Sequence, residues 1–155
     1  MLTYSPWKIE QTRFAPEQEA ELERQLAFSN GYISQYAFFE EFYSGSQSSG
    51  TWLRGIAGAI PPFSSVSVHL HDERLDLNTW HVQSFSRCLN RQEPLLERSV
   101  KAVSPNGRSL NLKVRRLLST DEPGLMQVRY AVSTDSYEGP ASFLSLLGEA
   151  KPTTP

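Results

Sequence analysis

Short runs of β-branched and aromatic residues, separated by turn-forming residues, dominate the chain beyond about residue 50. The clearest alternation lies in residues 65–71, where Val66, Val68 and Leu70 share one face and the residues between them are polar. Comparable patterns cover residues 52–60, 80–89, 95–103, 110–114, 126–132 and 141–147. About seven or eight short strands at hairpin spacing predict a mainly β protein, an antiparallel β-sandwich.

One short helix is predicted near the N-terminus. Pro16 suits the first helical position, acidic residues follow in the first turns, and Leu22 and Leu26 share a face. We expect Asn30-Gly31 to end this helix. The sequence Ser104-Pro105-Asn106-Gly107 predicts a hairpin turn, because proline fixes φ and glycine accepts the left-handed conformation. Residues 1–150 are expected to form a single β-sandwich domain, and residues 151–155 a tail.

Composition narrows the function classes. The chain has 155 residues, 15 Lys plus Arg, 17 Asp plus Glu, a net charge of -2 and one cysteine. One cysteine excludes an internal disulfide scaffold and a thiolate metal cluster, and no cofactor is expected. The near-neutral charge argues against nucleic acid or an anionic membrane as a partner. No apolar stretch approaches the roughly 20 residues of a membrane span, and no signal peptide is visible, so we expect a cytoplasmic protein.

Two histidines are candidates for a metal site. His69 and His71 stand two apart on a predicted strand, so both imidazoles would project from one face. Cupins use such a His-x-His pair followed by a glutamate, but Glu73 comes too soon for that spacing. If Val66, Val68 and Leu70 face the core, the histidines lie on the wetter face. A metal-dependent, cupin-like enzyme using His69 and His71 remains an alternative.

Charged residues are predicted to be solvated. Adjacent carboxylates such as Glu40 and Glu41 would point to opposite faces of a strand, which does not favour a paired acid and base. The same interpretation applies to Asp72-Glu73 and to Asp121-Glu122 in a turn. Basic residues that alternate with apolar ones along strands are expected on the wet outer face of the sandwich. Several residues of one basic cluster follow this pattern, and an anion or a domain partner could instead use the cluster. The cluster comprises Arg87, Arg91, Arg98, Lys101, Arg108, Lys113, Arg115 and Arg116.

Aromatic residues near the loop of residues 42–52 offer a second candidate site. Tyr43 and Trp52 flank a Ser/Gly-rich stretch, and loops at the end of a sandwich commonly carry function. Aromatic rings can stack on sugars, although large rings more often fill a core. Tyr43 and Trp52 are therefore the candidate carbohydrate-binding residues, and a free-standing carbohydrate-binding module is a further alternative.

Several segments resemble, in order, the N-terminal domain of glycoside hydrolase family 65, which contains the maltose, trehalose and kojibiose phosphorylases. The run from Leu26 to Ile33 resembles the stretch through the family's Asn-Gly-Tyr-Leu-Gly element. The collinear resemblance covers residues 7 to about 148. Its other segments are Trp7, Phe14, Glu40-Glu41, Ile56-Ala57-Gly58, Leu75-Asp76-Leu77, the segment from Gln83 to Arg98, the strand from Arg115 to Ser119 and the strand from Val128 to Val132.

The resemblance implies a sandwich of the galactose-mutarotase-like (supersandwich) type, packed in the family on a separate helical barrel that carries the catalytic residues. No catalytic residue is carried over to this chain. It implies a non-catalytic N-terminal domain of an enzyme acting on α-glucosides, with a structural, docking or carbohydrate-binding role. Because the family's sandwich is longer, an incomplete sandwich is expected here. Its open surface would be covered by the helical-barrel catalytic domain or by a second copy in a homodimer.

Overall fold

The computed structural model describes residues 2–41, 50–60, 64–135 and 137–146. Short helical segments form near the N-terminus, η1 (Pro16–Gln18) and α1 (Glu19–Gln25). Within the described residues, no helix has the length and apolar character needed to cross a membrane. The strands are β1 (Leu2–Tyr4), β2 (Lys8–Gln11), β3 (Phe28–Ser29), β4 (Ile33–Gln35), β5 (Thr51–Leu53), β6 (Ser65–Leu70), β7 (Glu73–Arg74), β8 (His81–Asn90), β9 (Leu95–Val103), β10 (Ser109–Leu118), β11 (Met126–Ser133) and β12 (Ala141–Leu146).

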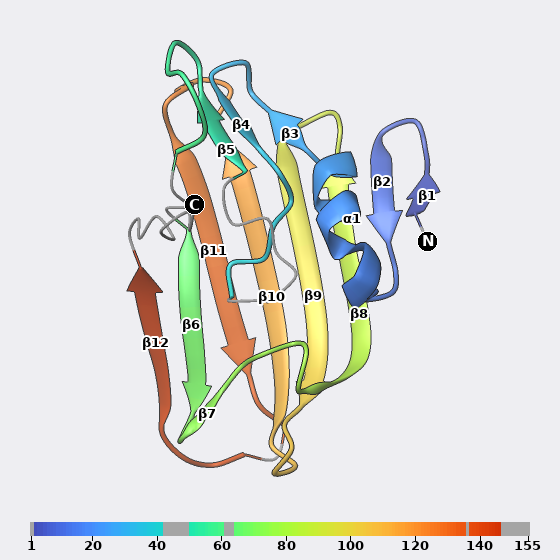
Figure 1. The fold of residues 1–155 in the computed structure, drawn as a ribbon, viewed down its shortest axis with the longest axis vertical. Coiled ribbons are helices and arrows are strands. Elements are labelled where there is room, and N and C mark those ends of the chain that lie inside the picture. Colours follow the sequence, from blue (N-terminus) through green and yellow to red (C-terminus); the bar gives the residue numbers. More distant parts are fainter. Residues whose placement is uncertain (1, 42–49, 61–63, 136, 147–155) are drawn as a thin grey trace, which may run out of the picture.

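The strands form three antiparallel sheets arranged in two layers. The largest sheet has six strands in the order β1-β2-β8-β9-β10-β11, and the smaller sheets have the orders β12-β6-β7 and β3-β4-β5. Figure 1 shows α1, β3–β5 and β6 lying over one face of the six-stranded sheet. This arrangement confirms the predicted antiparallel β-sandwich.

Local alternation predicted most of the long strands correctly. The strand at residues 95–103 and the hairpin turn at residues 104–107 are both present. Gly107 adopts φ 80°, and its N–H donates to the Ser104 carbonyl at 2.9 Å. The strand expected at residues 52–60 is shorter, because Gly55 and Gly58 take left-handed conformations that turn the chain back toward β5.

The predicted helix is confirmed, but its end was misplaced. It stops at Gln25, and Asn30-Gly31 instead forms the turn between β3 and β4. The Asn30 side chain accepts from the N–H groups of Tyr32 and Ile33 at 3.0 and 2.8 Å. Its amide also donates to the Ser119 carbonyl at 2.6 Å, which ties the turn to the end of β10. The β1–β2 hairpin was not predicted.

Most of the buried apolar residues fall into two separate clusters between the layers. One cluster joins β6 to the six-stranded sheet, and the other joins α1, β3 and β4 to the same sheet. The first contains Phe39, Val68, Leu70, Leu75, Leu77, Trp80, Phe85, Val100, Ala102, Leu110, Leu112 and Val114. The second contains Leu26, Phe28, Ile33, Ala37, Leu89, Leu96 and Leu118.

Candidate functional site

Three arginines lie on the inner face of the six-stranded sheet, between the two apolar clusters. Arg87 on β8 and Arg98 on β9 are register partners, and Arg116 lies on β10. Each side chain is at most 3% exposed. We call these three residues the arginine belt. A buried guanidinium is tolerated only where counter-charges and acceptors satisfy it, so the belt needs partners from outside the sheet.

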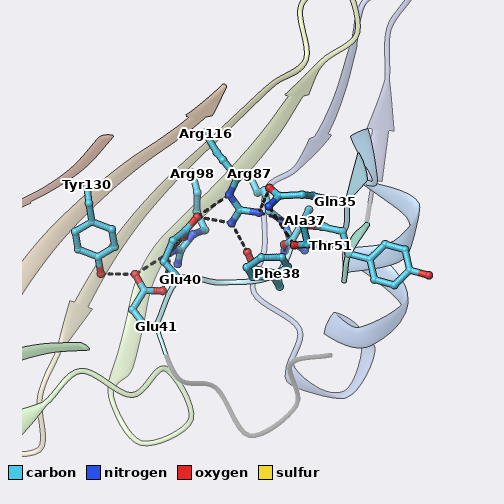
Figure 2. A network of polar contacts seen from close by, with 11 residues as sticks. Gln35, Ala37, Phe38, Glu40, Glu41, Thr51, Arg87, Arg98, Arg116 and Tyr130 are labelled. Carbon is cyan, nitrogen blue, oxygen red and sulfur yellow. Dashed lines mark hydrogen bonds and ion pairs between the residues drawn. The ribbon is translucent and has the colours of Figure 1, made fainter. Parts of the chain in front are cut away.

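The partners of Arg98 and Arg116 come from residues 36–41, which cross the sheet after β4 (Figure 2). We call residues 36–41 the crossing segment. Arg98 donates to the carboxylates of Glu40 and Glu41, each at 2.7 Å. Arg116 donates through Nε to Glu40 at 3.0 Å and through Nη2 to the Phe38 carbonyl at 2.7 Å. The arginines thus hold both side chains and backbone of this segment against the sheet.

Arg87 performs the same role for α1. Its Nη2 donates to Glu19 at 2.8 Å and to Gln11 at 2.6 Å, and its Nη1 donates to the Ala37 carbonyl at 2.6 Å. Gln11 in turn donates to Glu19 at 2.7 Å. Burial lowers the pKa of Arg87 to about 10, so the side chain remains charged at neutral pH. The arginine therefore connects β2, α1 and the crossing segment to β8.

Aromatic groups complete the belt. The guanidinium of Arg98 lies 4.6 Å from the ring centroid of Phe39, and that of Arg116 lies 4.4 Å from the ring centroid of Phe38. The Tyr130 hydroxyl of β11 donates to Glu41, at the end of the belt opposite Gln35 and Thr51 (Figure 2). Burial, reinforced by the Glu41 carboxylate, raises the pKa of Tyr130 far above its ordinary value.

The prediction that the charged residues of this site are solvated is wrong. Glu40 and Glu41 are each 3% exposed, and Arg87, Arg98 and Arg116 face inward. The sequence contained a signal that was missed, because each arginine occupies the same alternation parity as the apolar inward residues of its strand. The outer-face prediction is confirmed for exposed residues of opposite parity, such as Lys113 and Arg115.

The belt is organised for structure rather than for proton transfer. Burial by itself raises the pKa of Glu40, but the charges of Arg116 and Arg98 outweigh burial, so its pKa lies below the ordinary value. A carboxylate held ionised by two arginines is a poor general acid. Arg98 Nη1 is buried without a hydrogen-bond partner in the described part of the chain.

A second charged cluster joins two hairpins at one end of the sandwich. Arg108 donates to Asp72 at 2.9 Å and to Glu73 at 2.7 Å. Asp72 is exposed, as predicted, whereas Glu73 also accepts from the Ser104 hydroxyl and is largely buried. The hydrogen bond from Arg108 is the main reason that the pKa of Asp72 falls to about 2. This cluster links the β6–β7 turn to the β9–β10 turn.

The two candidate metal ligands occupy different settings. His69 lies on β6, half-buried, with Arg74 as its register partner. His71 follows the end of that strand, in the turn, with φ 58° and its Nδ1 3.0 Å from Asp72. The described residues contain no group of three or more His, Cys, Asp or Glu side chains arranged to hold a metal ion. A metal site at His69 and His71 stays a prediction.

Of the two candidate sugar-binding residues, Trp52 lies on β5 and Tyr43 lies outside the described residues. Trp52 is half-buried, and its ring packs edge-on against Tyr36 with 4.7 Å between ring centroids. Gly50 lies directly against Tyr36, since a Cβ at that position would stand 2.7 Å from the ring. The structure therefore shows a packed aromatic pair, and sugar binding there stays a prediction.

An apolar surface is open where β11 and β12 end their sheets. Phe143 is the register partner of Val68, which is 1% exposed, so both side chains face inward, yet Phe143 is 55% exposed. Its ring contacts Tyr130 at 6.5 Å between centroids. Val128 and Val132 are half-buried beside Tyr130. We call Val128, Tyr130, Val132 and Phe143 the β11–β12 rim.

The fold and the comparisons with known proteins define the class of protein. Residues 59–150 match the family described as glycosyl hydrolase family 65, N-terminal domain. The chain belongs to this family of carbohydrate-active proteins. A solved structure of a human-microbiome protein assigned as a kojibiose phosphorylase has a TM-score of 0.76 and 23% identity, over 86% of this chain and 20% of that one. This likeness confirms the fold.

Curated relatives are phosphorylases. The chain is 24% identical to the alpha,alpha-trehalose phosphorylase of Thermoanaerobacter brockii over 93% of its own length and 22% of the relative. It is 26% identical to the kojibiose phosphorylase of Halothermothrix orenii, over 88% of this chain and 19% of that one. It is also 26% identical to the maltose phosphorylase of Bacillus subtilis, over 80% of this chain and 19% of the relative. The chain thus spans about a fifth of the length of these relatives.

Proposed function

We propose that this chain is a structural and docking domain of a family 65 enzyme that acts on α-glucosides and carries its catalytic groups on a separate helical barrel. The relatives' names support this substrate class. The arginine belt supports the structural role, because the carboxylates of Glu40 and Glu41 are committed to ion pairs with its arginines. The proposed cellular location is the cytoplasm.

The observation that carries the docking role is the exposure of Phe143 at an inward-facing position. A large aromatic side chain that faces the inside of a sandwich and remains 55% exposed leaves apolar area in water. Burying apolar surface contributes about 25 cal/mol per Å2, which favours a partner on the β11–β12 rim. In a full-length enzyme we expect the rest of the polypeptide there, and in the isolated chain a second copy.

Sedimentation velocity tests docking. The 155-residue chain should sediment as a dimer, and Phe143→Ser should shift it toward monomer. Ile56→Ser is the matched control, because Ile56 is 56% exposed but follows β5 and is not one of the rim residues. A monomeric parent chain, or equal effects of both substitutions, would contradict this role.

An activity assay tests the non-catalytic assignment. The isolated chain should cleave none of maltose, trehalose and kojibiose, with or without phosphate. Turnover by the purified chain that survives further purification would show that it holds catalytic groups of its own.

A second candidate function is sugar binding at Trp52 and Tyr43, favoured by the Tyr36–Trp52 ring pair. Binding of maltose, trehalose or glucose should then change the tryptophan fluorescence saturably, and Trp52→Phe should remove the change. Trp7→Phe is the control, because Trp7 is 57% exposed on the distant β1–β2 hairpin. No response at millimolar sugar would exclude this candidate.

A further inference from the structure

Strand β11 has the features of an acceptor for another strand. It is the last strand of the six-stranded sheet, and its one ladder neighbour among the described residues is β10 (Figure 1). It extends over eight residues without proline. Its inward side chains are Met126, Val128, Tyr130 and Val132, so it lacks the inward charge that many exposed edges use to prevent pairing. Such edges bind extended polypeptide through main-chain hydrogen bonds.

A row of charges on the outer face of the sheet ends at β11. Glu97, Arg115 and Arg129 are successive register partners on β9, β10 and β11. The Arg115 Nε forms an ion pair with the Glu97 carboxylate at 2.8 Å. The Arg129 side chain has no ion pair or hydrogen bond within the described residues, and its cross-strand neighbour, Arg115, carries the same charge. Like charges opposite one another destabilise a strand pair, whereas opposite charges stabilise it.

A hollow of about 200 Å3 beside Arg129 leaves room for an incoming side chain on this face. Its lining consists of Glu93 in the turn before β9, Leu95 at the start of β9, Arg115, Leu117, Gln127 and Arg129, so two cations and one acid surround it. The inner face at the same edge is the apolar β11–β12 rim. An incoming strand therefore meets a cation on one face and apolar side chains on the other.

We propose that the free edge of β11 accepts an extended segment of a partner polypeptide, with a carboxylate opposite Arg129 and apolar residues covering Tyr130 and Phe143. The inference rests on the proposed docking function and names the chemistry of the docked segment. Alternation decides that chemistry, because neighbours of an outward acidic residue in a strand face inward. The recognised pattern is apolar-acidic-apolar. Main-chain hydrogen bonds to β11 supply affinity, and Arg129 supplies the preference for acid.

Peptide titration of the 155-residue chain, followed by 1H–15N NMR, tests the proposal. The probes are the blocked peptide Thr-Val-Glu-Val-Thr-Val and the same peptide with lysine in place of glutamate. The glutamate peptide should shift the amides of residues 126–133 saturably and bind about fivefold more tightly than the lysine peptide. Arg129→Glu should reverse that preference.

Lys113→Glu is the matched control, because Lys113 lies on the same outer face but on β10, away from the edge. This variant should keep the preference for the glutamate peptide. Absence of saturable shifts at several millimolar peptide, shifts elsewhere in the chain, or a preference unchanged by Arg129→Glu would overturn strand addition. If sedimentation still shows association through Phe143, docking stands and only the strand assignment fails.

Discussion

Arg116 and Glu40 form an ion pair between strand β10 and the segment that crosses the sheet, although 76 positions separate them in the chain. Both side chains are at most 2% exposed. Arg98 shares the same carboxyl group, so one glutamate neutralises charge from two strands. The pair lies between the two apolar clusters and explains why the core is divided.

Glu40→Gln should destabilise the fold strongly. The amide keeps the shape of Glu40 but leaves Arg98 and Arg116 with too little negative charge in a buried setting. Breaking a buried ion pair from one side costs about 3–5 kcal/mol. Urea unfolding measures this loss of free energy. Glu97→Gln is the control, because Glu97 pairs with Arg115 at an exposed site and its removal should have little effect. Equal losses in the two variants would contradict the buried belt.

The stability of the fold should depend on pH through Glu40. The pKa of Glu40 is lowered in the folded state, so its contribution is fully present above its unfolded pKa of about 4.3. That contribution is lost as the pH falls through the folded pKa. The difference in unfolding free energy between the parent chain and Glu40→Gln should therefore narrow as the pH falls below about 4. A constant difference across this range would show that Glu40 does not titrate as expected.

Removing Glu19 should release α1 from the sheet. The helix has seven residues, too few to be stable alone, and Glu19 connects it to Arg87 at 2.8 Å. Hydrogen exchange of the α1 amides should accelerate in Glu19→Ala by more than tenfold, since leaving Arg87 buried without its partner costs about 3 kcal/mol or more. Glu21→Ala, which removes an exposed pair with Arg24 and an exposed hydrogen bond from Gln25, should change exchange far less.

Gly50→Ala should disturb the aromatic pair. The added Cβ would stand 2.7 Å from the Tyr36 ring, which packs against Trp52. Overpacking of this kind costs about 1–3 kcal/mol, and the displaced ring should change the Trp52 fluorescence. Gly124→Ala is the control, because a Cβ there would meet Tyr32 at an ordinary 3.9 Å. If Gly50→Ala leaves both the Trp52 fluorescence spectrum and the midpoint of urea unfolding unchanged, Tyr36 moves aside freely.

The alternation of apolar and polar residues was sufficient to predict the long strands but not the buried ion pairs. Alternation identified β6, β9, β10 and β11, because each has one face toward the core. It missed the β1–β2 hairpin, whose short strands are largely exposed apart from Gln11. It also misplaced the end of the helix, because the long-range bond from Asn30 to Ser119 favours a turn between strands there.

The candidate sites were less accessible to sequence reasoning. Parity along β8, β9 and β10 places Arg87, Arg98 and Arg116 with the inward apolar residues. A single strand does not reveal whether an inward arginine meets a carboxylate. The acids that satisfy Arg98 and Arg116 lie on a segment 57 to 76 positions away.

The amino-acid sequence by itself determined an antiparallel β protein, its principal turns and its likeness to the family 65 N-terminal domain, because these depend on local alternation and local motifs. Tertiary structure alone decided which carboxylates neutralise the inward arginines, which edge strands lack a second neighbour in the described chain, and where apolar surface stays open. The physical reason is that the cost of burying a charge or exposing a ring depends on groups brought close only by folding.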